Sequence, residues 1–144
     1  MVEFQSTKEW FEAYPDKTCL IIKNNEVIET STFKGVKPLL VFYQANGTSL
    51  EPLLVVDRIM GKGAIMLALL CGATKVMTPI ISKPAILYAK RKGLEVVADK
   101  IVPYVINRTG DGRCPIESAV IQIDDLEVGY KAIIGAIEAL MRKG

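Results

Sequence analysis

An apolar segment near the middle of the chain, residues 63–73, limits what the chain can fold into more than any other feature. The segment contains no charged residue, and apolar side chains occupy nearly every face of a helix built from it. Such a helix is too short to cross a bilayer, which needs about 20 apolar residues. The segment therefore predicts a central helix that is packed on both sides. We expect Asp57 to cap this helix, which then runs through Cys71 and ends at Gly72.

The segments around this helix have the patterns of short strands and amphipathic helices. Asn24 and Asn25 tolerate positive φ and predict a hairpin of residues 18–22 and 26–31. Further strands are expected at residues 53–56, 75–81, 94–98 and 101–106, with an irregularity at Pro79. Helices are expected at residues 6–14, 35–47 and 84–92, in a short segment after 114, and at 124–143.

The order of these elements predicts the architecture. A hairpin followed by alternating helices and strands indicates a three-layer α/β/α arrangement, in which a mixed sheet carries helices on both faces. The chain has no repeat, no low-complexity tract and no linker long enough to separate domains. We therefore expect one α/β domain over residues 1–144.

Charge and cysteine usage favour a cytoplasmic protein without a nucleic-acid or membrane partner. The 144 residues contain 18 basic and 16 acidic side chains, and no run of like charges forms a track for nucleic acid. The N-terminal residues lack the pattern of a signal peptide. The three cysteines lie far apart, which is typical neither of a disulfide framework nor of a metal motif.

The chain contains no histidine, which excludes several kinds of catalytic site. A Ser-His-Asp triad, a Cys-His pair and every histidine-containing zinc site need a residue that is absent. Catalysis, if any, must use carboxylates, Lys, Tyr, Ser or a thiolate. We expect no metal and no cofactor.

Cys114 and Glu117 are the candidate catalytic residues. Cys114 is expected at an N-cap, with Pro115 in the first helical position and Glu117 in the third. A thiol there feels the positive end of the helix dipole and the nearby Arg108 and Arg113, which favour a thiolate. Alternatively, Cys114 is a small buried apolar residue and Glu117 only caps its own helix.

Two helix starts are candidate anion-binding sites. Lys62, between two glycines, adds an ammonium to the backbone N–H groups at the start of the central helix. Ser82 and Lys83 precede Pro84 at the start of the next helix, and such helix starts converge near the ends of the strands. The alternatives are glycines that permit close packing, ordinary capping and solvated lysines. Asp57 is included as a ligand-binding candidate, although a capping role is favoured.

The polar loop of residues 107–113 is a further candidate. Asn107 and Arg108 lie in it, and an arginine there offers a fork of donors for a carboxylate or phosphate. The alternative is a solvated connection.

The order of hairpin, central helix, strand, proline-started helix and strand resembles that of the cytidine deaminase superfamily. In that superfamily, His-x-Glu or Cys-x-Glu begins the central helix and Pro-Cys-x-x-Cys begins the next. Pro84 matches the proline, but Ala85 and Tyr88 stand at the two cysteine positions. Gly61 or Lys62 stands near the first ligand, and no glutamate follows two residues later. The resemblance implies the fold without the zinc site, its activated water or its proton shuttle.

The whole chain is also similar to a family of uncharacterised prokaryotic proteins of unknown function with this fold. The matching segments cover most of the chain: Gly35-Val36-Lys37-Pro38, Asp57 with Gly61-Lys62, Ser82-Lys83-Pro84, and Asn107-Arg108 followed by Cys114-Pro115-Ile116-Glu117. This resemblance implies a fold more than an activity.

Three functional hypotheses follow. The favoured one is a metal-free domain that binds a small anionic or nucleotide-like molecule through Lys62, Lys83, Arg108 and backbone N–H groups. The second is a zinc-independent enzyme for group transfer or hydrolysis, which uses Cys114 or Glu117 with Lys62, because some domains of the deaminase fold transfer groups without a metal. The third is a structural module in which the C-terminal helix, or the cluster of Trp10, Phe11 and Tyr14, forms a homo-oligomer surface.

Overall fold

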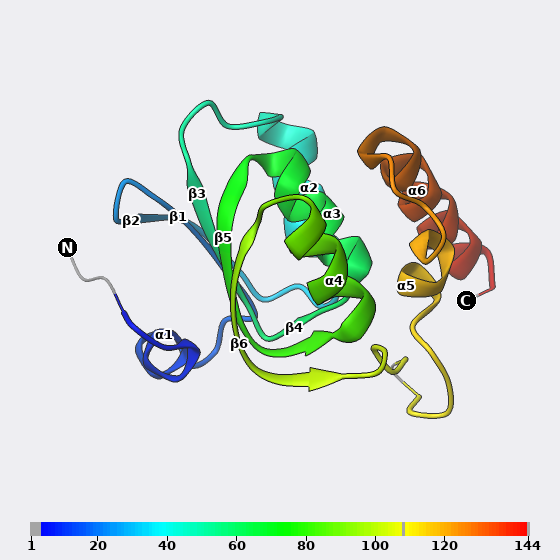
Figure 1. Ribbon diagram of the computed structural model, residues 1–144, viewed down its shortest axis with the longest axis horizontal. Coiled ribbons are helices and arrows are strands. Elements are labelled where there is room, and N and C mark those ends of the chain that lie inside the picture. The colour runs from blue at the N-terminus through cyan, green and yellow to red at the C-terminus, as the bar shows by residue number, and fades with distance from the viewer. Residues whose placement is uncertain (1–3, 108, 144) are drawn as a thin grey trace.

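The computed structural model describes residues 4–107 and 109–143 and shows a mixed six-stranded sheet with six helices (Figure 1). The strands are β1 (Cys19–Lys23), β2 (Glu26–Ser31), β3 (Leu53–Asp57), β4 (Ile59–Met60), β5 (Ala73–Ser82) and β6 (Glu95–Val102). The helices are α1 (Thr7–Ala13), α2 (Lys37–Asn46), α3 (Lys62–Cys71), α4 (Lys83–Arg91), α5 (Pro115–Val120) and α6 (Leu126–Lys143).

Strand β5 organises the sheet. It is parallel to β3, β4 and β6, whereas β1 is antiparallel to its neighbours β2 and β3. Strand β6 lies along one edge of β5, while β3 pairs with the other edge as far as Met77 and β4 takes over from Ile80. Pro79 lies at this change of partner and is skipped in the register with β6. The predicted irregularity at Pro79 is confirmed, because a residue without an N–H fits where the ladder is already interrupted.

Helices lie on both faces of the sheet, but unequally (Figure 1). Helices α2, α3 and α4 cover one face, and α5 and α6 pack against α3 from outside (Figure 1). Of the helices in the described part of the chain, α1 alone covers the other face, where Trp10 and Phe11 pack with Leu20, Val56 and Met77. The outer pair of helices adds a layer that the sequence did not predict.

Helix α3 is the buried central helix that the apolar segment predicts. It lies between the sheet and α6, and every one of its residues except Leu69 is buried. Gly72 ends it with φ 99°, in the left-handed region that favours glycine. No helix in the part of the chain that the structure describes is long and apolar enough to cross a membrane.

The predicted capping role of Asp57 is wrong. Strand β3 runs through Asp57, which pairs with Cys19 of β1, and the short strand β4 follows before α3 begins. The N-cap of α3 is Gly61, which provides no side-chain hydrogen bond. The antiparallel pairing of β3 with β1 includes Asp57 as its last residue. Asp57 therefore lies buried at the end of a strand and not at the start of a helix.

Most of the other local predictions are confirmed. Ser6 caps α1 and accepts a hydrogen bond from the Glu9 N–H at 3.2 Å. Asn24 and Asn25 have φ values of 51° and 63° in the hairpin turn. Ser82 caps α4, and Pro84 lies in its first turn. The two strands expected at 94–98 and 101–106 are instead one strand, β6, because its pairing with β5 resumes at Lys100 after the interruption at Pro79 and continues to Val102.

Glycine 61 sits where two elements approach closely, and this yields a prediction. A Cβ atom on Gly61 would lie 2.9 Å from Oε2 of Glu117 and 3.0 Å from Cγ2 of Val105. We expect Gly61→Ala to lower the free energy of unfolding by about 1–3 kcal/mol, as overpacked substitutions do. Gly135→Ala is the control, because nothing lies within 4 Å of its Cβ position in α6. It should raise the free energy by up to about 1 kcal/mol. Equal stabilities of the two variants in urea denaturation would contradict the close packing at Gly61.

Candidate functional site

The carboxylate of Glu117 joins the starts of two helices to the segment after β6. Its Oε2 accepts hydrogen bonds from the backbone N–H of Lys62 at 2.7 Å and from the hydroxyl of Ser82 at 2.5 Å. Its Oε1 accepts a hydrogen bond from the backbone N–H of Val105 at 2.8 Å. Glu117 is only 4% exposed. Since the N–H groups of the first helical turn have no acceptor within the helix, Glu117 acts as an internal anion at the start of α3.

Helix α5 must lie against the start of α3 for this contact to form. The Cys114 N–H donates to the carbonyl of Val105 at 2.8 Å, which fixes the start of α5. A Cβ atom on Gly63 would lie 3.0 Å from Cγ2 of Ile116. The glycines on either side of Lys62 therefore permit close packing. The prediction that Glu117 caps its own helix is wrong, because its carboxylate reaches α3 and Ser82 instead.

The backbone N–H of Lys62 bonds to Glu117, whereas its side chain has other partners. Its ammonium donates a hydrogen bond to the carbonyl of Ile121 at 3.1 Å and lies 5.0 Å from the centre of the Tyr88 ring. Lys62 is 5% exposed, and within the described residues no carboxylate is close enough to form an ion pair with it. Burial, and then the charge of Arg91, lower the pKa of Lys62, while Asp124 and Glu117 oppose that shift.

A cluster of charges surrounds Tyr88, which is fully buried. The Tyr88 hydroxyl donates to the carbonyl of Asp124 at 2.5 Å. The Asp124 carboxylate pairs with Arg91 at 2.8 Å and with Lys92 at 2.9 Å. These two partners, Arg91 first, lower the pKa of Asp124. The carboxylate is thus shared by two cations, and a third cation, Lys62, lies near the same ring.

Two neighbouring clefts border these groups. The first, which we call the lysine cleft, has a volume of about 230 Å³ and is lined by Lys62, Pro84, Leu87, Arg91, Ile121, Gln122, Ile123 and Asp124. The second, which we call the glutamate cleft, has a volume of about 380 Å³ and is lined by Pro84, Pro103, Tyr104, Arg113, Glu117, Ser118 and Ile121. Pro84 and Ile121 line both clefts, so the two adjoin.

The structure brings together only some of the candidate residues. Lys62, Ser82 and Glu117 meet through the hydrogen bonds of the Glu117 carboxylate. Lys83 is exposed and lines neither cleft. Cys114 packs against the larger core cluster and also lines neither cleft.

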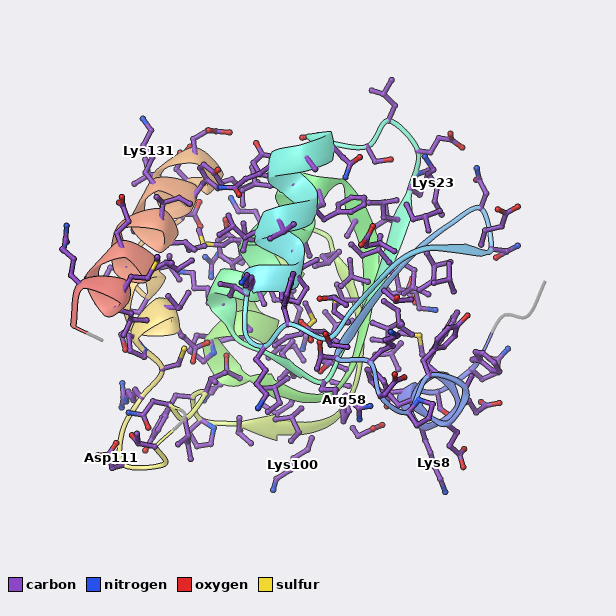
Figure 2. The ribbon with its side chains drawn as sticks, turned by 180° about the vertical axis from the view of Figure 1, so that it is seen from behind. Lys8, Lys23, Arg58, Lys100, Asp111 and Lys131 are labelled. Carbon is purple, nitrogen blue, oxygen red and sulfur yellow. The ribbon has the colours of Figure 1, made fainter. Side chains whose placement is uncertain are left out.

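The loop of residues 107–113 is closed by its own hydrogen bonds. The Asn107 side chain donates to Asp111 at 3.0 Å, and its backbone N–H donates to the carbonyl of Gly112 at 2.8 Å. Asp111 lies at the far end of this loop, away from the sheet (Figure 2). Arg108 lies outside the described residues. At the end of the loop, Arg113 lines the glutamate cleft, and its guanidinium lies 4.4 Å from the centre of the Tyr104 ring.

Asp57 is buried apart from these groups. Its Oδ1 accepts a hydrogen bond from the Arg58 N–H at 2.9 Å, and its Oδ2 has no partner among the described residues. Burial raises the pKa of Asp57 from 3.8 to about 8, although the Arg58 N–H opposes the shift. Figure 2 shows Arg58 beside α1, where its guanidinium donates to the carbonyls of Lys17 and Pro15. Asp57 therefore lies at a strand end and contributes to neither cleft.

Sequence reasoning missed several residues that shape the clefts. From the sequence, Tyr88 stands out only as a replacement for a cysteine ligand, and Arg91, Tyr104 and Asp124 are not among the candidate residues. The three basic residues Lys90-Arg91-Lys92 at the end of α4 and the two aspartates before α6 are visible in the sequence. Their encounter depends on how α5 turns the chain back over α4, which no local pattern encodes.

Comparison with known proteins places the chain in a family. A family model described as TM1506, a domain of unknown function (DUF1893), matches residues 9–137. The chain belongs to this family. The matched region includes both clefts and the Glu117 contacts. No curated protein matches the chain.

A solved DUF1893 structure has the same overall fold. The chain is similar to the crystal structure of a DUF1893 family protein, TM1506, from Thermotoga maritima at 2.70 Å resolution. The two are 25% identical, with a TM-score of 0.78 over 94% of this chain and 92% of that chain. The family description assigns no activity, so the DUF1893 fold is shown and its chemistry must be argued from the clefts. In the described residues, no group of three or more His, Cys, Asp or Glu side chains is arranged to hold a metal ion.

The three donors to Glu117 predict a large effect of removing its charge. Glu117→Gln removes the charge and replaces one of the two acceptor oxygens with an NH2 group that can only donate, so that either the Val105 N–H or the Lys62 N–H and Ser82 lose their acceptor. We expect the free energy of unfolding in urea to fall by about 2–4 kcal/mol, because buried donors to a charged group lose their partner. Glu138→Gln, on the exposed side of α6, is the control and should change it by less than about 0.5 kcal/mol. Similar stabilities of the two variants would show that the Glu117 contacts contribute little.

The raised pKa of Asp57 predicts a particular pH dependence. Between about pH 4 and about pH 8 the folded state holds a proton on Asp57 that the unfolded state has lost. The free energy of unfolding therefore decreases as the pH rises through this window, with a contribution of up to about 1.4 kcal/mol per pH unit. Asp57→Asn should remove this decrease and be more stable than the parent protein at pH 8. The exposed Asp16→Asn variant should keep the parent's dependence. Parallel curves for parent and Asp57→Asn would contradict the assignment.

Proposed function

We propose that this DUF1893 domain binds a small anionic molecule in the lysine cleft and holds it with side-chain cations. The observation that carries the proposal is the side chain of Lys62, a residue only 5% exposed, which lines a cleft and has no carboxylate partner among the described residues. Removing an ammonium from water without a counter-ion is unfavourable. An anion in the cleft supplies that counter-ion.

The neighbouring charges support the same ligand class. Among the described residues that line the lysine cleft, Asp124 is the only acidic one, and Arg91 and Lys92 already share its carboxylate. The carboxylate of Glu117 already accepts three hydrogen bonds, one of them from the backbone N–H of Lys62, and so its charge is directed to the start of α3. The cleft is therefore left with surplus positive charge from Lys62 and Arg91, which favours a carboxylate or phosphate group.

We also propose that the domain has a cytidine deaminase-like fold without the zinc motifs. The order of hairpin, α3, β5, proline-started α4 and β6 supports this resemblance. At the two positions of the family's cysteine ligands, Ala85 donates its N–H to Ser82, and Tyr88 donates its hydroxyl to the carbonyl of Asp124. Tyr88, at the second of these positions, thus belongs to the charge cluster beside the lysine cleft. The alternative of a thiol-dependent enzyme lacks comparable support, because Cys114 lines neither cleft.

Thermal unfolding with inorganic phosphate tests the proposed function. A site with a Kd of about 1 mM stabilises the folded state by about 2 kcal/mol at about 20 mM phosphate. We expect the Tm to rise by several degrees relative to sodium chloride of equal ionic strength. Lys62→Met should abolish the rise, because it removes the buried charge while it keeps an unbranched apolar side chain.

Lys83→Met is the matched control for this experiment. Lys83 belongs to the next helix start, is exposed and lines neither cleft. The phosphate-dependent rise should persist in this variant. A rise that persists in Lys62→Met, or no rise in the parent protein, would contradict anion binding in the lysine cleft.

A further inference from the structure

The glutamate cleft adjoins the proposed anion site but differs from it in character. Four of its lining residues offer apolar or aromatic surface, namely Pro84, Pro103, Tyr104 and Ile121. The lysine cleft, by contrast, is lined by the positively charged Lys62. The glutamate cleft has a volume of about 380 Å³, which is in the range of small-molecule sites. Since Pro84 and Ile121 line both clefts, the glutamate cleft lies directly beside the proposed anion site.

The polar groups of the glutamate cleft favour a ligand that donates hydrogen bonds. Oε1 of Glu117 accepts one hydrogen bond among the described residues, from Val105, whereas Oε2 accepts two. A carboxylate oxygen has room for a second donor, and as an anion it can only accept. Because three donors already fix the carboxylate, it needs no rearrangement to receive an N–H from a ligand. The Ser118 hydroxyl lines the same cleft.

The aromatic wall of the cleft favours a planar group. The guanidinium of Arg113 lies over the Tyr104 ring at 4.4 Å, and both of these planar groups belong to residues that line the cleft. Planar rings stack on tyrosine and on arginine, and the prolines and Ile121 offer apolar contact.

We propose that the glutamate cleft is a second subsite that takes a planar ring with an N–H donor, joined to the anionic group held in the lysine cleft. The inference rests on the proposed function and narrows its ligand to a nucleotide-like class. Tyr104 and Arg113 contact the ring, Glu117 accepts its N–H, and Lys62 with Arg91 holds the phosphate.

Calorimetric titration with a set of related probes separates the two subsites. The probes are ribose 5-phosphate, uridine and inosine, and the 5′-monophosphates of uridine and inosine. We expect at least one of the monophosphates to bind about tenfold or more tightly than ribose 5-phosphate, because stacking adds to the anion contact. Methylation of the ring N–H, as in 3-methyluridine or 1-methylinosine monophosphate, should weaken binding by about tenfold.

Variants of Tyr104, which lines the glutamate cleft, provide the controls for this test. Tyr104→Ala should reduce the affinity for the monophosphate to that of ribose 5-phosphate without changing ribose 5-phosphate binding, and Tyr104→Phe should behave like the parent. Equal affinities of ribose 5-phosphate and both monophosphates in the parent would overturn the ring subsite and leave the proposed function intact. If no phosphate probe binds, the proposed function fails. In that case, Tyr104-dependent binding of the nucleosides would still support the ring subsite, and no nucleoside binding would overturn it.

Discussion

The carboxylate of Glu117 is buried and accepts hydrogen bonds from donors in three separate parts of the chain. The first turn of α3, the cap residue of α4 and the segment after β6 meet at one carboxylate. Because a helix start offers N–H groups and a positive dipole end, the charge is stabilised there and the donors of the helix start gain an acceptor. The contact also holds α5 against α3, and so it determines how the chain returns over α4 and forms the two clefts.

This arrangement separates the two polar ends of Lys62. Its backbone N–H is taken by Glu117, while its side chain extends to Ile121 and Tyr88 on the other side. An internal anion therefore satisfies the helix start, and the ammonium remains as the group that lacks a counter-ion among the described residues. The lysine cleft and the glutamate cleft are consequences of this division, since one contains the ammonium and the other contains the carboxylate.

Local sequence patterns predicted most elements because their causes are local. The apolar run of α3, the capping serines 6 and 82 and the two asparagines of the hairpin each act within a few residues. The errors have a common source in tertiary contacts. Asp57 has the residue type of a cap, but pairing of β3 with β1 places it in the sheet. Glu117 has the spacing of a capping box, but the glycines around Lys62 allow α5 to approach so closely that its carboxylate bonds to α3. Tyr104 and Arg91, which are distant in sequence, become cleft residues only through that approach.

The ionisation of Lys62 is the most direct test of the proposed anion site, because Lys62 provides the positive charge that lines the lysine cleft and lacks a carboxylate partner among the described residues. The pKa of its ammonium can be followed by NMR of the side-chain nitrogen and the adjacent carbon, with and without saturating phosphate. We expect the pKa of Lys62 to lie below the ordinary range of lysine in the free protein and to rise toward that range when the anion binds. The Lys62 backbone N–H signal should stay in place, because Glu117 is not displaced. An ordinary pKa that phosphate does not change, or a large shift of the backbone signal as phosphate replaces Glu117, would contradict the proposed anion site.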